Sequence, residues 1–226
     1  LVRATYDTES RELQRILGGA VESIARRNAG AVVELLGSSD PIVAASAARI
    51  VGANRIEGTA EALRELLYSG AVEVRRAAVE AIGALRPASI MGALVETLLD
   101  PDAEVRIRAA RVLGAAAYTP AASRFREILE SKEIRQAERT EKIAFFEAYG
   151  MLRDPKGVEV LDRYLNGKGF LGRREPSEIR ASAALGLGRT GTSEAFALLR
   201  RAANDDDPIV RSAVARGLAM REETDG

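Results

Sequence analysis

Residues 100–114 read DPDAEVRIRAARVLG, and this stretch decides the fold. Asp100 and Pro101 favour a helix start, because a carboxylate accepts the unpaired amides of the first turn and Pro needs no donor there. Apolar residues from Val105 to Leu113 then recur at spacings of three and four, which makes one apolar stripe on a helix. A second start at Thr119-Pro120 predicts a returning helix, so the unit is a helical hairpin with Asp100 as its first N-cap.

The same pattern recurs along the chain. Each copy begins with a branched residue. In most copies an Arg follows it, and then come a run of Ala and a final small residue. That residue falls at Gly52, Gly83, Gly114, Gly150, Gly188 and Ala219, at intervals of 31, 31, 36, 38 and 31 residues. A period in this range indicates stacked supersecondary units rather than one closed core. We predict that Gly83 and Gly114 let neighbouring helices approach closely.

These copies predict an all-α, right-handed solenoid of about six helical hairpins in one domain, 1–226. The second helix of the unit at 71–100 should begin at Pro87, and a further helical stretch should cover 8–27. Turns are expected near 38–41, 70–72, 100–102, 131–136, 167–176 and 204–208. The expected units are N-terminal capping helices at 1–37, repeats at 38–70, 71–100, 101–131, 132–167 and 176–206, and a C-terminal capping helix at 207–226.

Composition excludes several kinds of chemistry. The chain has no Cys and no His, which removes thiolate chemistry and the commonest general base and metal ligand. We therefore expect no metal, no cofactor and no enzymatic activity. Lys plus Arg equals Asp plus Glu, 33 each, so net charge gives no attraction to nucleic acid. No apolar run approaches the roughly 20 residues that span a bilayer. A cytoplasmic segment cut from a longer protein is the expectation.

The pattern at 100–114 and its copies resemble HEAT repeats, especially the bacterial HEAT-like type shared with phycobilin lyases. The resemblance covers about 30–220, and the richness in Ala, Arg and Gly is typical of a GC-rich bacterium. It implies a binding scaffold for a protein partner. The HEAT-like hydroxylase uses His-Glu metal motifs, which a chain without His excludes. HEAT-like DNA glycosylases have a basic concave face with aromatic residues, which the zero net charge and lack of Trp disfavour. A lyase-like protein stays an alternative.

One column of cations follows the repeat. Its members are Arg75, Arg106, Arg180 and Arg211, with Lys142 aligned and Ala44 interrupting it. A basic stripe for phosphates is one interpretation. We favour the other, in which each Arg pairs with an Asp or Glu of the turns between repeats, because the Arg belongs to the repeat itself.

Residues 167–172 match Gly-x-Gly-x-x-Gly, but a helix precedes them and no strand is expected, so a dinucleotide site is disfavoured. The lengthened loop at 167–175 is instead a candidate partner contact, and trypsin should cleave there first. The second helices, which line the concave side of such stacks, add a column that changes from acidic to basic toward the C-terminus. The candidate partner-binding residues are Arg126, Arg163, Lys168, Phe170, Arg173, Arg174, Arg200 and Arg201. An anionic ligand or nucleic acid on this C-terminal basic patch is the alternative to a protein partner.

Overall fold

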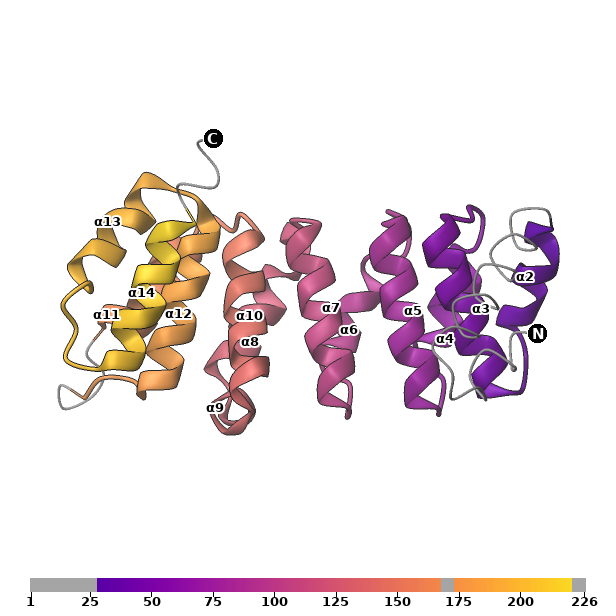
Figure 1. Ribbon diagram of the computed structural model, residues 1–226, viewed down its shortest axis with the longest axis horizontal. Helices are drawn as coiled ribbons and strands as arrows, with labels where there is room; N and C mark the ends of the chain where they lie inside the picture. The colour runs from indigo at the N-terminus through magenta and orange to yellow at the C-terminus, as the bar shows by residue number, and fades with distance from the viewer. Residues whose placement is uncertain (1–27, 168–172, 221–226) are drawn as a thin grey trace, which may run out of the picture. The chain divides into compact units, whose positions relative to one another are not determined.

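A computed structural model describes residues 28–167 and 173–220 (Figure 1). The helical stretch predicted at 8–27, and the candidates Lys168 and Phe170, lie outside the described residues. The chain divides into two compact units, Leu1–Ala109 and Ala110–Gly226. The repeat boundaries and the single domain stay predictions.

The all-α prediction is confirmed, since the described residues form thirteen α-helices and no strand. Unit 1 contains α2 (Ala29–Leu36), α3 (Pro41–Asn54), α4 (Ala60–Leu66), α5 (Val72–Leu85), α6 (Ala93–Thr97) and the start of α7 (Ala103–Ala115). Unit 2 contains the end of α7, a 3-10 turn (Thr119–Ala121), α8 (Ala122–Glu130), α9 (Lys132–Gln136), α10 (Arg139–Met151), α11 (Gly157–Asn166), α12 (Ser177–Thr190), α13 (Ser193–Arg201) and α14 (Pro208–Ala219).

The first helices of successive hairpins pack directly on one another. In unit 1, α3 lies against α5, and in unit 2, α12 lies between α10 and α14 (Figure 1). Small residues allow this approach. A Cβ on Gly114 would lie 2.8 Å from the Cα of Ala148, and one on Gly52 would lie 2.8 Å from the Cα of Ala81. The packing role of Gly114 is confirmed, whereas Gly83 is half-buried and its role stays a prediction.

Each second helix buries one large apolar residue in the core of its hairpin. These are the aligned residues Leu63, Leu94, Phe125, Leu161 and Leu199, all fully buried. In unit 2, aromatic residues enlarge this core, with Phe125 and Phe145 ring centroids 5.7 Å apart. Phe146 meets Tyr164 edge to face at 5.2 Å. The opposite side of each second helix is therefore left for charged residues.

Helix starts agree with the sequence at two Asp-Pro pairs and differ at a third. Asp40 accepts from the amide of Ile42, and Asp207 accepts from that of Ile209, as N-caps do. The prediction for Asp100 is wrong, because α7 begins three residues later. Asp102 caps it by accepting from Val105 N at 3.0 Å, and Asp100 instead accepts from Asp102 N at 2.8 Å.

Two predicted connections also differ. The second helix expected from Pro87 begins only at Ala93, because successive i→i+3 hydrogen bonds, as from Ile90 N to Pro87 O, make tight turns before it. The turn expected at 131–136 contains the short helix α9. Ser131 caps that helix by accepting from the amide of Ile134, whose side chain is buried. Local capping and burial explain this extra turn of helix.

Candidate functional site

The column of cations is a structural feature of the repeat. Arg75 donates from Nε and Nη2 to the two carboxylate oxygens of Asp100, at 2.7 and 2.8 Å. Its Nη1 also donates to the carbonyl of Ser69 at 2.9 Å. Arg180 binds Asp205 across an equal separation in sequence, but with Nη2 alone, because its Nε donates to Leu165 O at 3.2 Å. These guanidinium groups hold a turn in place.

Other members of the column repeat the contact with the preceding turn. Arg106 donates to Asp100 O at 2.7 Å, and Arg211 donates to Asp205 O at 2.6 Å. Lys142 binds Glu178 instead, with Nζ and Oε2 2.6 Å apart. Pairing with an Asp or Glu is therefore seen for Arg75, Arg180 and Lys142. Arg106 and Arg211 instead bind backbone carbonyls of the turns.

Arg126, a candidate binding residue, belongs to a partly buried network in unit 2. Its guanidinium binds the carboxylate of Asp154, which also accepts from the hydroxyl of Tyr149 at 2.7 Å. Burial, followed by the hydrogen bond to Asp154, raises the pKa of Tyr149 well above its ordinary value. Arg126 thus fastens α8 to the turn before α11, and its charge is already matched.

Two further candidates have carboxylate partners. Arg163 Nη2 lies 2.8 Å from Glu130 Oε1, and both side chains are exposed, so water screens this pair. Arg174 Nη1 lies 3.0 Å from Asp205 Oδ2, the carboxylate that Arg180 also binds. The end of the lengthened loop at Arg174 is therefore tied to the turn before α14.

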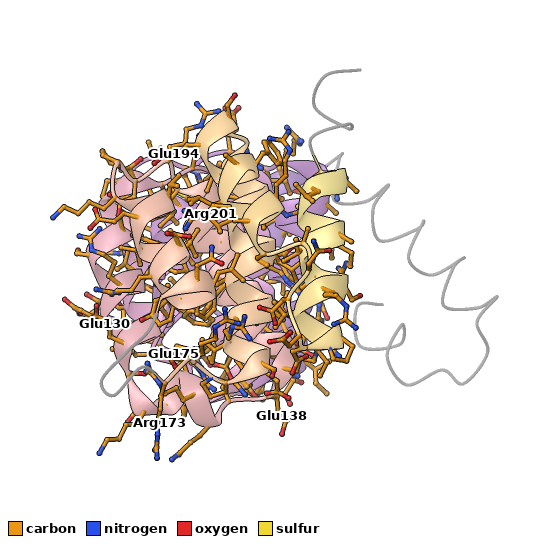
Figure 2. The ribbon with its side chains drawn as sticks, turned by 90° about the vertical axis from the view of Figure 1, so that its left-hand side faces the viewer. Glu130, Glu138, Arg173, Glu175, Glu194 and Arg201 are labelled. Atoms are coloured by element: carbon orange, nitrogen blue, oxygen red, sulfur yellow. The ribbon has the colours of Figure 1, made fainter. Side chains whose placement is uncertain are left out.

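The remaining described candidates are Arg173, Arg200 and Arg201, all exposed and without an ion pair within residues 28–167 and 173–220. Arg200 and Arg201 are the last two residues of α13, and Leu199 just before them is buried. In the end-on view of Figure 2, Glu194 is labelled above Arg201, and Glu175 and Glu138 are labelled nearer to Arg173. The structure thus offers free cations among carboxylates rather than one basic patch.

Unit 2 also has a hollow on its first-helix layer that the sequence did not predict. It lies among α10, α12 and α14 and has a volume of about 240 Å³. Its lining includes Ala181, Ser182 and Leu185 of α12. The signal for it in the sequence is weak, because small residues on a first helix are also what close packing requires.

Two kinds of site are not found in the described part of the chain. Its His, Cys, Asp and Glu side chains form no group of three or more that could hold a metal ion. Among its helices, none combines the length and apolar character needed to cross a bilayer.

Solved structures show the same fold. The complex of CpcE and CpcF of phycocyanin lyase from Nostoc sp. PCC7120 matches with a TM-score of 0.59 and 22% identity, over 82% of this chain and 74% of that one. A designed armadillo repeat protein matches with a TM-score of 0.51 and 17% identity, over 84% of this chain and 98% of that one. No curated protein sequence matches. At these identities the likeness concerns the fold alone.

The repeat assignment has independent support from the family comparison. The model of HEAT repeats matches residues 60–144 and 170–225, which together make up more than half of the chain. These ranges include the Arg75–Asp100 and Arg180–Asp205 pairs and the close-packed Gly114. The chain belongs to the HEAT-repeat family.

Proposed function

We propose that this chain is a non-catalytic interaction module that binds a protein partner through the second-helix face of unit 2. The observation that carries the proposal is the pair Arg200 and Arg201. Both are exposed without an ion pair in the described part of the chain, on a helix whose buried Phe196 and Leu199 fix its orientation. Cations that no intramolecular carboxylate matches, on a rigid helix, are suited to steer and orient a charged partner.

A protein partner suits this surface better than a nucleic acid. Phosphate backbones are bound by several cations acting together. Here Arg126, Arg163 and Arg174 already have carboxylate partners, which leaves few cations for phosphates. The helix α13, which ends with the Arg pair of the proposal, also carries the exposed Glu194 in its first turn (Figure 2). A surface of mixed sign favours a partner that also carries both signs.

The non-catalytic part of the proposal rests on residue chemistry. The whole chain lacks His and Cys, and so lacks the commonest general base and the thiolate nucleophile. The likeness to the phycocyanin lyase complex is one of fold and brings no lyase activity with it. Repeat solenoids instead present extended surfaces for binding.

A site-specific photo-crosslinker tests the proposal. It is placed at position 201 on α13 and, as a matched control, at position 111 on α7, where an exposed Arg lies on a first helix. In cells of the source organism, we expect position 201 to cross-link to a protein and position 111 not to do so. Arg200→Glu should reduce the product several-fold, whereas Arg64→Glu on α4 should not.

Two results would contradict the proposed function. Equal cross-linking from both positions would mean that the second-helix face has no special role. A product that nucleases destroy would show that the face binds nucleic acid, and a steep loss of binding with added salt would accompany it.

A further inference from the structure

The hollow among α10, α12 and α14 has a floor of small side chains. Helix α12 is buried continuously from Ile179 to Gly188, including the side that faces away from the second helices. On that side lie Ala181, Ser182 and Leu185, which are 6%, 1% and 2% exposed. Because these side chains are short or covered, α12 fills less space than α10 and α14 on either side of it. This difference leaves the hollow.

The walls of this groove are apolar. Ile143 of α10 and Ile209 of α14 both line it. Ile209 is 42% exposed, which makes it one of the few large apolar side chains of unit 2 that face solvent. The Ser182 hydroxyl on the floor already donates to the carbonyl of Glu178. A floor of small side chains beside an exposed aliphatic wall is the arrangement that receives an apolar side chain of a partner.

The rim of the groove carries an excess of positive charge. Arg139 of α10 and Arg216 of α14 line it, both are exposed, and neither has an ion pair among the described residues. The one lining carboxylate, Glu178, is already bound by Lys142 at 2.6 Å. The hydrogen bond from Lys142 lowers the pKa of Glu178, and the charge of Arg139 also acts on Glu178 and helps to lower that pKa. The rim therefore carries two guanidinium groups against one carboxylate that Lys142 already binds, and this excess of positive charge complements an acidic partner.

We propose that this groove docks a segment of a partner protein in which one or two aliphatic side chains are flanked by carboxylates. The aliphatic anchor would cover the floor and Ile209, and the carboxylates would bind Arg139 and Arg216. The volume of about 240 Å³ lies below the roughly 300–1,000 Å³ of small-molecule sites, so it suits side chains of a peptide. This surface lies on the first-helix layer and is independent of the one proposed above.

Fluorescence anisotropy with a defined probe tests the inference on the full chain. The probe is a short labelled peptide in which a Leu-Leu pair is flanked on each side by Glu and Asp. We expect saturable binding, and no binding when the acidic residues are replaced by Lys. Ile209→Ser and Arg216→Glu should each weaken binding by about tenfold, because each removes one of the two contacts.

The chain offers a matched control for the apolar contact. Ile42 stands in the same tetrapeptide, Asp-Pro-Ile-Val, and is 39% exposed, but it belongs to unit 1 and does not line the groove. Ile42→Ser should leave binding unchanged. Changing Arg200 and Arg201 to Glu should also leave it unchanged, which separates this test from that of the proposed function.

Several outcomes would overturn the inference. They are the absence of saturable binding, equal binding of the Lys peptide, and full binding by Ile209→Ser. If the free protein sediments as a dimer that Ile209→Ser converts to a monomer, the occupant is a second copy instead. If a chain ending at 220 binds the probe and the full chain does not, then residues 221–226 of the chain itself occupy the groove instead of a partner.

Discussion

The guanidinium of Arg75 and the carboxylate of Asp100 form two parallel hydrogen bonds, with N···O distances of 2.7 and 2.8 Å. The two side chains are only 11% and 6% exposed. Asp100 at the same time accepts from the amide of Asp102, which caps α7. The pair therefore joins α5 to the start of the next hairpin. In unit 2, Arg180 and Asp205 make the equivalent link through one hydrogen bond, and Asp205 likewise accepts from the amide of Asp207.

Removing one member of this pair should destabilise the protein strongly. Arg75→Ala leaves the buried carboxylate of Asp100 without its partner, and we expect a loss of about 3 kcal/mol in the free energy of unfolding. The exposed pair of Arg64 and Glu61 is the control, and Arg64→Ala should cost less than about 1 kcal/mol. Urea unfolding measures both, and equal losses would refute a special role for the buried pair.

Close packing at Gly114 should make it intolerant of a side chain. A Cβ there would meet the Cα of Ala148 at 2.8 Å, so α7 and α10 must separate. Gly114→Ala should lower the free energy of unfolding by about 1–3 kcal/mol, and Gly114→Leu should lower it further. Gly157→Ala is the control, since the nearest atom to its Cβ would be 3.9 Å away. A thermal melt in which both Ala variants behave alike would contradict this packing.

Two tyrosine hydroxyls each donate a hydrogen bond to a carboxylate, one in the core and one at the surface. Tyr149 is fully buried and donates to Asp154 at 2.7 Å, whereas Tyr68 is 64% exposed and donates to Glu96 at 2.9 Å. Tyr149→Phe should cost about 1–2 kcal/mol, because the buried carboxylate loses a donor that water does not replace. Tyr68→Phe should cost less than about 0.5 kcal/mol. Guanidinium unfolding compares them, and the reverse order would disprove the network at Asp154.

From neutral pH downward, stability should change only in acid. Burial opposes ionisation of Asp205, but hydrogen bonds from Arg180 and the amide of Asp207, with nearby Arg charges, outweigh it and lower its pKa. A lowered carboxyl pKa stabilises the fold above the unfolded value of about 4, and this stability is lost as pH falls through the folded pKa. With no His in the chain, the urea midpoint should be nearly flat between about pH 5.5 and 8.

Asp205→Asn provides the test of this assignment. It should lower the urea midpoint at neutral pH and weaken the fall in acid, while Asp206→Asn, an exposed neighbour, is the matched control. A wild-type midpoint that changes steeply near pH 6.5, or an Asp205→Asn variant with the full acid dependence, would contradict it.

Local signals account for the part of the fold that the sequence predicted. The stripe from Val105 to Leu113, the Asp-Pro caps at Asp40 and Asp207, and the small residue at Gly114 each act within one helix or its nearest neighbour. Such signals depend on helical periodicity and capping, which are properties of short segments. The sequence by itself therefore determined the helical hairpins, the repeat and the structural role of the Arg column.

Only the tertiary structure decided which candidate side chains are free. Arg126 and Arg200 align in the same column of second helices, yet Arg126 binds Asp154 and Arg200 is exposed without an ion pair in the described residues. The groove likewise combines Ile143 and Ile209 from separate hairpins. Periodicity fixes which helix face a residue occupies, but the reach of a side chain across to the next hairpin depends on how the helices pack. The free surface therefore follows from three-dimensional packing rather than from the repeat.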